Sequence, residues 1–147
     1  MIVVDDRLLF EVLSGTETSE FTQHASGGIA TTFSWYYRLS RALATERVDG
    51  SLTRQFAALT DERRTHVHSL LEDLPSRIEL LHPRDLVPPM SAVAALTSVN
   101  FLTAEAISVS MILEAPILVS TRSALMERAA AIAGVDVIVI DPRETRP

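Results

Sequence analysis

Hydrophobic residues along this chain follow two patterns that alternate from end to end. Five short runs rich in valine and isoleucine, at residues 2–4, 29–32, 78–81, 117–119 and 135–140, have the continuous apolar character of buried strands. Between them, apolar residues recur at intervals of three and four, which predicts amphipathic helices. The predicted helices cover residues 7–13, a short segment around Phe21, a stretch from Trp35 to Leu43, and residues 52–59, 61–74, 91–96, 103–114 and 123–133. Strands that alternate with helices predict a three-layer α/β/α domain with a roughly five-stranded parallel sheet.

Polar residues at the helix ends indicate where these elements start and stop. We expect Ser34, Thr60, Thr103 and Ser123 to cap the starts of the helices that follow them, because their hydroxyl oxygens accept hydrogen bonds from free backbone N–H groups. The Pro88-Pro89 pair is expected to break the chain before the helix at 91–96. We predict one domain over residues 1–141 and a C-terminal tail over residues 142–147.

Composition and charge narrow the class of protein. The 147 residues suit one domain, and with 47% hydrophobic residues there is enough material for a core. The absence of cysteine excludes a disulfide scaffold, a thiolate nucleophile and a cysteine-based metal site. No apolar run approaches the ~20 residues needed to cross a bilayer. Acidic charge at Asp5 and Asp6 is unlike a signal peptide. We therefore predict a cytoplasmic protein without a membrane partner.

The basic residues, and the absence of several catalytic and binding motifs, limit which reactions and ligands the sequence supports. The net charge of −6 argues against a broad electrostatic grip on nucleic acid, although a local contact is still open. All 13 basic residues are arginine, whose planar group suits phosphate or carboxylate. The sequence has no nucleophile elbow, no glycine-rich nucleotide motif and no histidine pair at metal-binding spacing.

Candidate chemistry gathers after the predicted strands. In a parallel sheet, the carboxyl ends of the strands share one edge, and ligands bind there. Asp5 and Asp6 follow the first strand, and residues 34–37 follow the second. Glu105 lies near the start of a later helix, and residues 120–122 follow the fourth strand. We expect these distant segments to meet on one small patch.

These residues also carry a family resemblance. The opening run of residues 1–5, followed by an apolar helix, resembles the first motif of the PIN domain family. Residues 102–106 and 112–120 resemble the C-terminal half of that family. The resemblance implies a PIN-like fold and a hydrolase of toxin–antitoxin systems, a ribonuclease that uses Mg²⁺ or Mn²⁺ held by carboxylates. It also implies RNA and an antitoxin-like protein as partners, and a homodimer.

The family pattern assigns roles to individual residues. Asp5 and Glu105 match two of the family's acids and would be the catalytic carboxylates, with Asp6 as a third metal ligand. Two positions depart from the pattern: Tyr36 stands in the region where a glutamate is expected, and Arg122 replaces an aspartate. Because a guanidinium can take the place of a missing cation, we hypothesise that Arg122 pairs with Asp5 or Glu105.

Simpler interpretations stand beside these roles. Asp5 and Asp6 could serve simply as helix caps, with no catalytic role. Glu105 could likewise serve simply to stabilise the first turn of its own helix. Arg38 and Arg41 could contact RNA together with residues 35–37, or Trp35 could belong to the core and the arginines to the solvated surface. Two functions therefore stay open: a metal-dependent ribonuclease, or a PIN-like RNA- or protein-binding module that has lost hydrolysis. The loss of anionic ligands favours the second.

Overall fold

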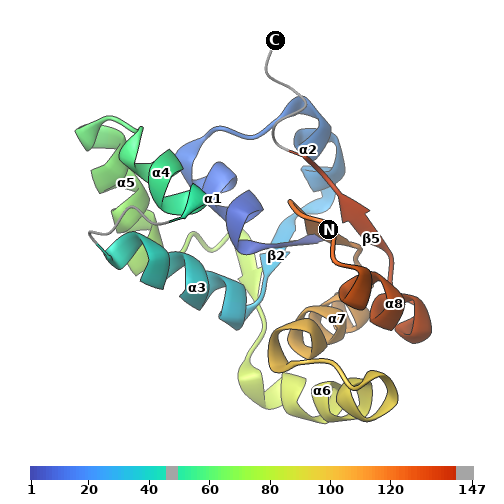
Figure 1. Ribbon diagram of the computed structural model, residues 1–147. Helices are drawn as coiled ribbons and strands as arrows, with labels where there is room; N and C mark the ends of the chain where they lie inside the picture. The colour runs from blue at the N-terminus through green and yellow to red at the C-terminus, as the bar shows by residue number, and fades with distance from the viewer. Residues whose placement is uncertain (46–49, 142–147) are drawn as a thin grey trace.

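The computed structural model describes residues 1–45 and 50–141, and within them five strands form one all-parallel sheet (Figure 1). The strands are β1 (Ile2–Val4), β2 (Ile29–Thr31), β3 (Ile78–Leu80), β4 (Ile117–Val119) and β5 (Val137–Val139). Their order across the sheet is β3-β2-β1-β4-β5, so the first strand lies in the centre. All five predicted strands therefore form, and the predicted α/β class is confirmed. The predicted tail, residues 142–147, lies outside the described residues.

Helices connect the strands. They are α1 (Asp6–Ser14), α2 (Ser19–His24), the 3₁₀ turn η1 (Ala25–Gly27), α3 (Phe33–Ala44), α4 (Ser51–Ala57), α5 (Asp61–Glu72), α6 (Pro83–Thr97), α7 (Phe101–Leu113) and α8 (Ala124–Ala133). Within the described ranges, no single helix is both long and apolar enough to cross a membrane by itself.

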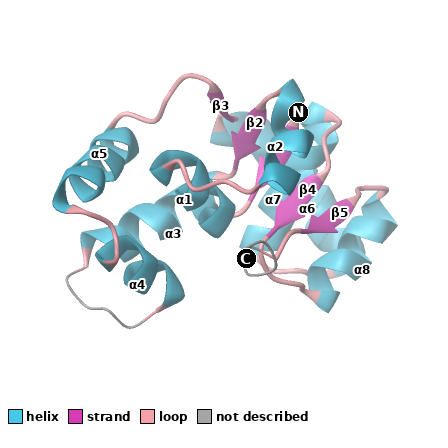
Figure 2. Cartoon of the chain, turned by 90° about the horizontal axis from the view of Figure 1, so that it is seen from above, coloured by secondary structure: helices cyan, strands magenta, loops and turns pink. Residues whose placement is uncertain are grey.

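Side chains of the central strands divide the core into two layers. In β1, Ile2 and Val4 pack with the core residues of α1, α3 and α5, whereas Val3 packs with those of α6, α7 and α8. In β4, Leu118 faces the first group and its two neighbours face the second. This alternation is the two-residue period of a strand, and it places helices on both faces of the sheet (Figures 1 and 2).

Two helices begin earlier than the sequence predicted. Thr32, and not Ser34, caps α3: its Oγ1 accepts a hydrogen bond from the backbone N–H of Trp35 at 3.0 Å. Asn100, and not Thr103, caps α7 through its Oδ1. In both cases a second good capping residue lies shortly before the predicted one, two residues earlier for α3 and three for α7, and the helix extends to it. The predicted caps Thr60 and Ser123 are confirmed.

The expected break at Pro88-Pro89 is wrong, because α6 runs through both prolines. Each proline removes one helical hydrogen bond. The carbonyl acceptors left without a donor belong to Arg84 and Asp85, which are exposed, so water can satisfy them. The buried side chains of α6 pack into the α7 and α8 layer of the core, and this tertiary packing outweighs the local preference.

Candidate functional site

The candidate site lies at the carboxyl edge of the sheet. Val4 of β1 is in register with Thr31 of β2 on one side and with Leu118 of β4 on the other. The segments that follow these three strands therefore leave the sheet side by side. They carry Asp5, the start of α3 and Ser120, as the topology predicted.

Asp5 is buried and its carboxylate is occupied by hydrogen bonds. Its Oδ1 accepts the backbone N–H of Leu8 at 2.9 Å, so Asp5 is the N-cap of α1. Its Oδ2 accepts both the backbone N–H of Ser120 at 2.6 Å and the hydroxyl of Ser120 at 2.8 Å. The same side chain thus starts a helix after β1 and holds the loop after β4. This is the capping interpretation, with an additional long-range partner.

Glu105 is also buried, with 2% of its surface exposed, and it acts on a different helix from its own. It lies in the second turn of α7 because that helix starts at Phe101, so the expectation of a first-turn role is wrong. Its Oε1 accepts the backbone N–H of Phe33 at 3.0 Å, and its Oε2 accepts that of Ser34 at 3.1 Å. These are the first two N–H groups of α3, which have no partner inside that helix. Glu105 is therefore a tertiary cap that places a negative charge at the positive end of α3.

Asp6 pairs with Arg38, whose Nη2 lies 3.3 Å from its Oδ2. Burial raises the pKa of Asp6, Arg38 opposes this increase, and the neighbouring charge of Asp5 adds to it. The positive charge of Arg38 is therefore partly neutralised by Asp6, although the arginine side chain is 56% exposed.

The two departures from the family pattern have other partners than the acids. Arg122 does not pair with Asp5 or Glu105, and this part of the sequence hypothesis is wrong. Its Nε lies 3.3 Å from Oε1 of Glu127 on α8, at the surface. Tyr36 donates its hydroxyl proton to the carbonyl of Leu71 and so joins α3 to α5. Burial, and less so the charge of Asp73, raises the pKa of Tyr36.

Whether this edge can hold Mg²⁺ or Mn²⁺ depends on which lone pairs of its carboxylate oxygens are not already used in hydrogen bonds. Such ions require several oxygen ligands with free lone pairs. In Asp5 and Glu105, all four carboxylate oxygens already accept hydrogen bonds from N–H or O–H groups of the chain. Across residues 1–45 and 50–141, no three His, Cys, Asp or Glu side chains gather as a metal site. Only Oδ2 of Asp5 has both lone pairs hydrogen-bonded, but the other three oxygens are also directed at N–H groups of the chain. The donor set therefore fits a divalent ion poorly.

A pair of exposed aromatic rings stands at the start of α3, beside the capped edge. Phe33 and Tyr37 are one helical turn apart, and their rings stack with centroids 6.3 Å apart and planes 11° from parallel. They are 50% and 54% exposed. Arg38 and Arg41 lie on the same helix and are exposed. Trp35, in contrast, is buried in the core, as the simpler interpretation held.

Sequence reasoning missed Phe33, which it placed before the helix. Its signal was present as an aromatic pair at the i, i+4 spacing, and this spacing brings side chains together only inside one helix. The misplaced start of α3 concealed it.

Comparison with known proteins adds no family name. No protein-family model matches the chain, and no curated protein matches it. The all-parallel five-stranded sheet with helices on both faces is compatible with a PIN-like fold. It is the fold, together with the residues at its carboxyl edge, that bears on function.

Proposed function

We propose that this chain is an RNA-directed protein with a PIN-like fold that binds single-stranded RNA and has lost hydrolysis. The observation that carries the proposal is the solvent-facing stack of Phe33 and Tyr37 at the carboxyl edge of the sheet. The stack presents two neighbouring aromatic rings to solvent, and unpaired bases are flat groups that stack on such rings.

Charge supports the same assignment. The whole chain is acidic, so RNA would not be drawn to it at large. On α3, however, Arg38 and Arg41 accompany the stacked rings, and guanidinium groups bind phosphate oxygens. Aromatic stacking beside arginines is the usual chemistry of single-strand binding. The contact is therefore local, which agrees with the low basic content.

The state of the acids favours binding over cleavage. Asp5 and Glu105 are turned toward N–H groups of the protein, whose positive ends would repel a cation at the same oxygens. Arg122 stands where the family pattern has an aspartate, and Tyr36 stands in the region where it has a glutamate. Descent from a PIN-type nuclease explains why acids persist at this edge, and their capping roles explain why they are kept without a metal.

The partners implied by the resemblance, an antitoxin-like protein and a second copy of the chain, belong to this proposal as predictions, as does a cytoplasmic location. The exposed apolar side chains of α6 and of the start of α7, namely Val87, Leu96 and Phe101, are the surface that we propose for a protein partner.

The direct experiment is fluorescence anisotropy with a labelled single-stranded RNA. We expect Phe33→Ala and Tyr37→Ala each to weaken binding by roughly tenfold, because each ring contributes ~1–3 kcal/mol of stacking. Ile132→Ala is the matched control: Ile132 is 64% exposed on the last turn of α8, which ends at the opposite edge of the sheet. Equal affinity of the two aromatic variants and the control would refute the assignment of α3 as the RNA-binding element.

One observation favours metal-dependent RNA cleavage as a second candidate. Burial is the largest cause of the raised pKa of Asp6 and Arg38 opposes it, but the charge of Asp5 adds to the increase. The two carboxyl groups therefore repel one another at this edge, and a bound divalent ion would relieve that repulsion. On this alternative, Asp5, Asp6 and Glu105 would hold the ion. It requires the hydrogen bonds of Asp5 or Glu105 to be exchanged for metal contacts, and it predicts RNA cleavage that depends on Mn²⁺ and is lost in Asp5→Asn.

A further inference from the structure

The spacing of the two exposed rings on α3 sets a condition on any strand that binds there. The ring centroids of Phe33 and Tyr37 lie 6.3 Å apart, and their planes are 11° from parallel. Four residues of an α-helix advance about 6 Å along its axis, so this separation follows from the i, i+4 positions of the two residues. Both rings are about half exposed, and each can offer a surface to a base.

Neighbouring bases of a stacked strand are much closer together than these rings. They follow one another at ~3.4 Å, little more than half of the distance between the ring centroids. Two consecutive bases that each cover one ring must therefore separate from one another. A base inserted between the rings would also leave its neighbours, because a ring would then lie on either side of it. In both arrangements, stacking on the protein replaces stacking between bases.

The next position along the same side of α3 is a cation. Arg41 follows Tyr37 by one further turn and is exposed. Across residues 1–45 and 50–141, no ion pair involves Arg41, whereas Arg38 is paired with Asp6. The guanidinium group of Arg41 is therefore available to a phosphate beside the second ring. We call Phe33, Tyr37 and Arg41 the α3 stripe.

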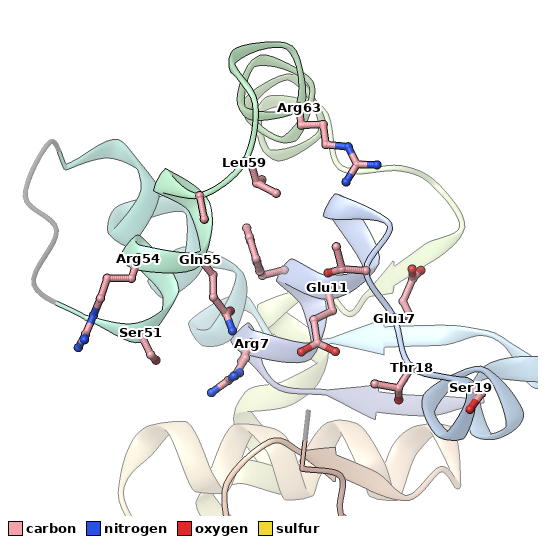
Figure 3. A pocket seen from close by; sticks show the side chains of 13 residues that line it. Arg7, Glu11, Glu17, Thr18, Ser19, Ser51, Arg54, Gln55, Leu59 and Arg63 are labelled. Carbon is pink, nitrogen blue, oxygen red and sulfur yellow. The ribbon is translucent and has the colours of Figure 1, made fainter. Parts of the chain in front are cut away.

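An open pocket of about 990 Å³ is separate from the α3 stripe. It lies between α1, the loop after α1, α4 and the start of α5 (Figure 3). Side chains of both charges line it, namely Arg7, Arg54, Arg63, Glu11 and Glu17 (Figure 3). A strand of phosphates would meet carboxylates there as well as guanidinium groups, and so gains little from this wall. Because no residue of the α3 stripe lines the pocket, the path of the strand is set by α3.

We propose that the α3 stripe selects unstacked single-stranded RNA and therefore prefers uridine-rich to adenine-rich strands. The inference rests on the proposed RNA binding and specifies its ligand. Adenine bases stack strongly on one another within a single strand, whereas uracil bases stack weakly. An oligo(U) strand thus presents separated bases at a lower cost. Preferences of this kind come from stacking strength and backbone flexibility, without hydrogen bonds to base edges.

A simple aromatic platform would give the opposite order. If bases could cover the rings while still stacked on one another, adenine would bind better, because its larger ring system makes more contact with an aromatic side chain. The order of affinity for oligo(U) and oligo(A) therefore distinguishes a surface that separates bases from one that does not.

Fluorescence anisotropy of the full chain with labelled oligo(U) and oligo(A) of equal length tests the proposal. We expect oligo(U) to bind at least about threefold more tightly, since oligo(A) has to break at least one stacking step. Phe33→Ala should bind both strands more weakly and lose the preference, because a single ring requires no separation of neighbouring bases. Ile132→Ala, exposed on α8, should retain the preference. Circular dichroism establishes that Phe33→Ala is folded.

A third strand separates stacking from base identity. In oligo(A) with an abasic residue after each adenine, the adenines are no longer direct neighbours. We expect this strand to bind more tightly than continuous oligo(A) with the same number of adenines. The added phosphates contribute equally in Phe33→Ala, so the part of the gain that is due to unstacking should vanish in that variant.

The possible results separate this inference from the proposed function. Binding of oligo(A) as tight as that of oligo(U), or tighter, would overturn the selection of unstacked strands and leave RNA binding in place. A preference for oligo(U) that persists in Phe33→Ala would overturn the role of the ring pair. Binding of neither strand would overturn the proposed function together with this inference.

Discussion

Single carboxylates near the sheet edge have very different environments in this protein. Asp5 accepts three hydrogen bonds, whereas Oε2 of Glu11, six residues later, is buried and has no hydrogen-bond partner among the described residues. The local cap made by Asp5 is predictable, because its donor lies three residues away. Its bonds to Ser120 are not, because 115 residues separate the two and only the completed sheet brings them together. The sequence therefore singles out Asp5 as a site residue but does not reveal its long-range hydrogen-bond partner, Ser120.

Glu11 makes the stability of the protein depend on pH. Its pKa is raised on folding, from 4.5 to about 7, so the folded state holds this proton more tightly than the unfolded chain does. The stabilisation that results is fully present below about pH 4.5 and is lost as the pH rises toward and past 7. We expect Glu11→Gln, which cannot ionise, to be more stable than the wild type at pH 8 by on the order of 1 to 3 kcal/mol, allowing for solvent screening at the open pocket.

Urea unfolding at pH 5 and pH 8 measures this effect. The difference between Glu11→Gln and the wild type should grow between the two pH values, and the exposed variant Glu72→Gln should show no such growth. A pH-independent difference for Glu11→Gln would mean that Glu11 is ionised normally in the folded protein.

At the scale of elements, the interaction of α7 with α3 is the least expected feature. Glu105 on α7 caps a helix 71 and 72 residues away in sequence. The spacing of apolar residues predicts that both helices exist. In the sequence, Glu105 is simply an acidic residue near the start of one of them. The tertiary cap explains the one charged side chain in a helix that is buried throughout residues 103–110. The same is true of α6, which is unbroken: packing between helices overrides the helix-breaking preference of Pro88 and Pro89.

Removing the charge of Glu105 should destabilise α3. In Glu105→Gln one N–H donor of α3 would face an amide NH₂ group in place of an oxygen, so we expect a loss of about 1–3 kcal/mol in the free energy of unfolding. Glu127→Gln is the matched control, because the surface pair of Glu127 with Arg122 should contribute less than ~1 kcal/mol. Chemical denaturation compares the two variants. A loss no larger than that of the control would contradict the capping role.

For the whole molecule, the fold was predictable and the site was predictable only in part. Five apolar runs separated by helical spacing leave few arrangements other than a parallel sheet between helices, and the topology then places Asp5 and the start of α3 at one edge. The direction of each carboxylate, the exposure of Phe33 and the partner of Arg122 depend on three-dimensional packing. The resemblance indicated an acidic metal edge, whereas hydrogen bonds from the chain occupy the carboxylates there.

RNA binding without cleavage is the property proposed for this edge on which the other functional predictions depend. The most direct measurement follows a labelled single-stranded RNA, saturated with protein, by anisotropy and then by gel electrophoresis, in Mn²⁺ and in EDTA. We predict the same anisotropy under both conditions and full-length RNA throughout. Shortening of the RNA in Mn²⁺, absent in EDTA and absent with Asp5→Asn, in which asparagine still caps α1, would contradict the account and establish a metal-dependent ribonuclease.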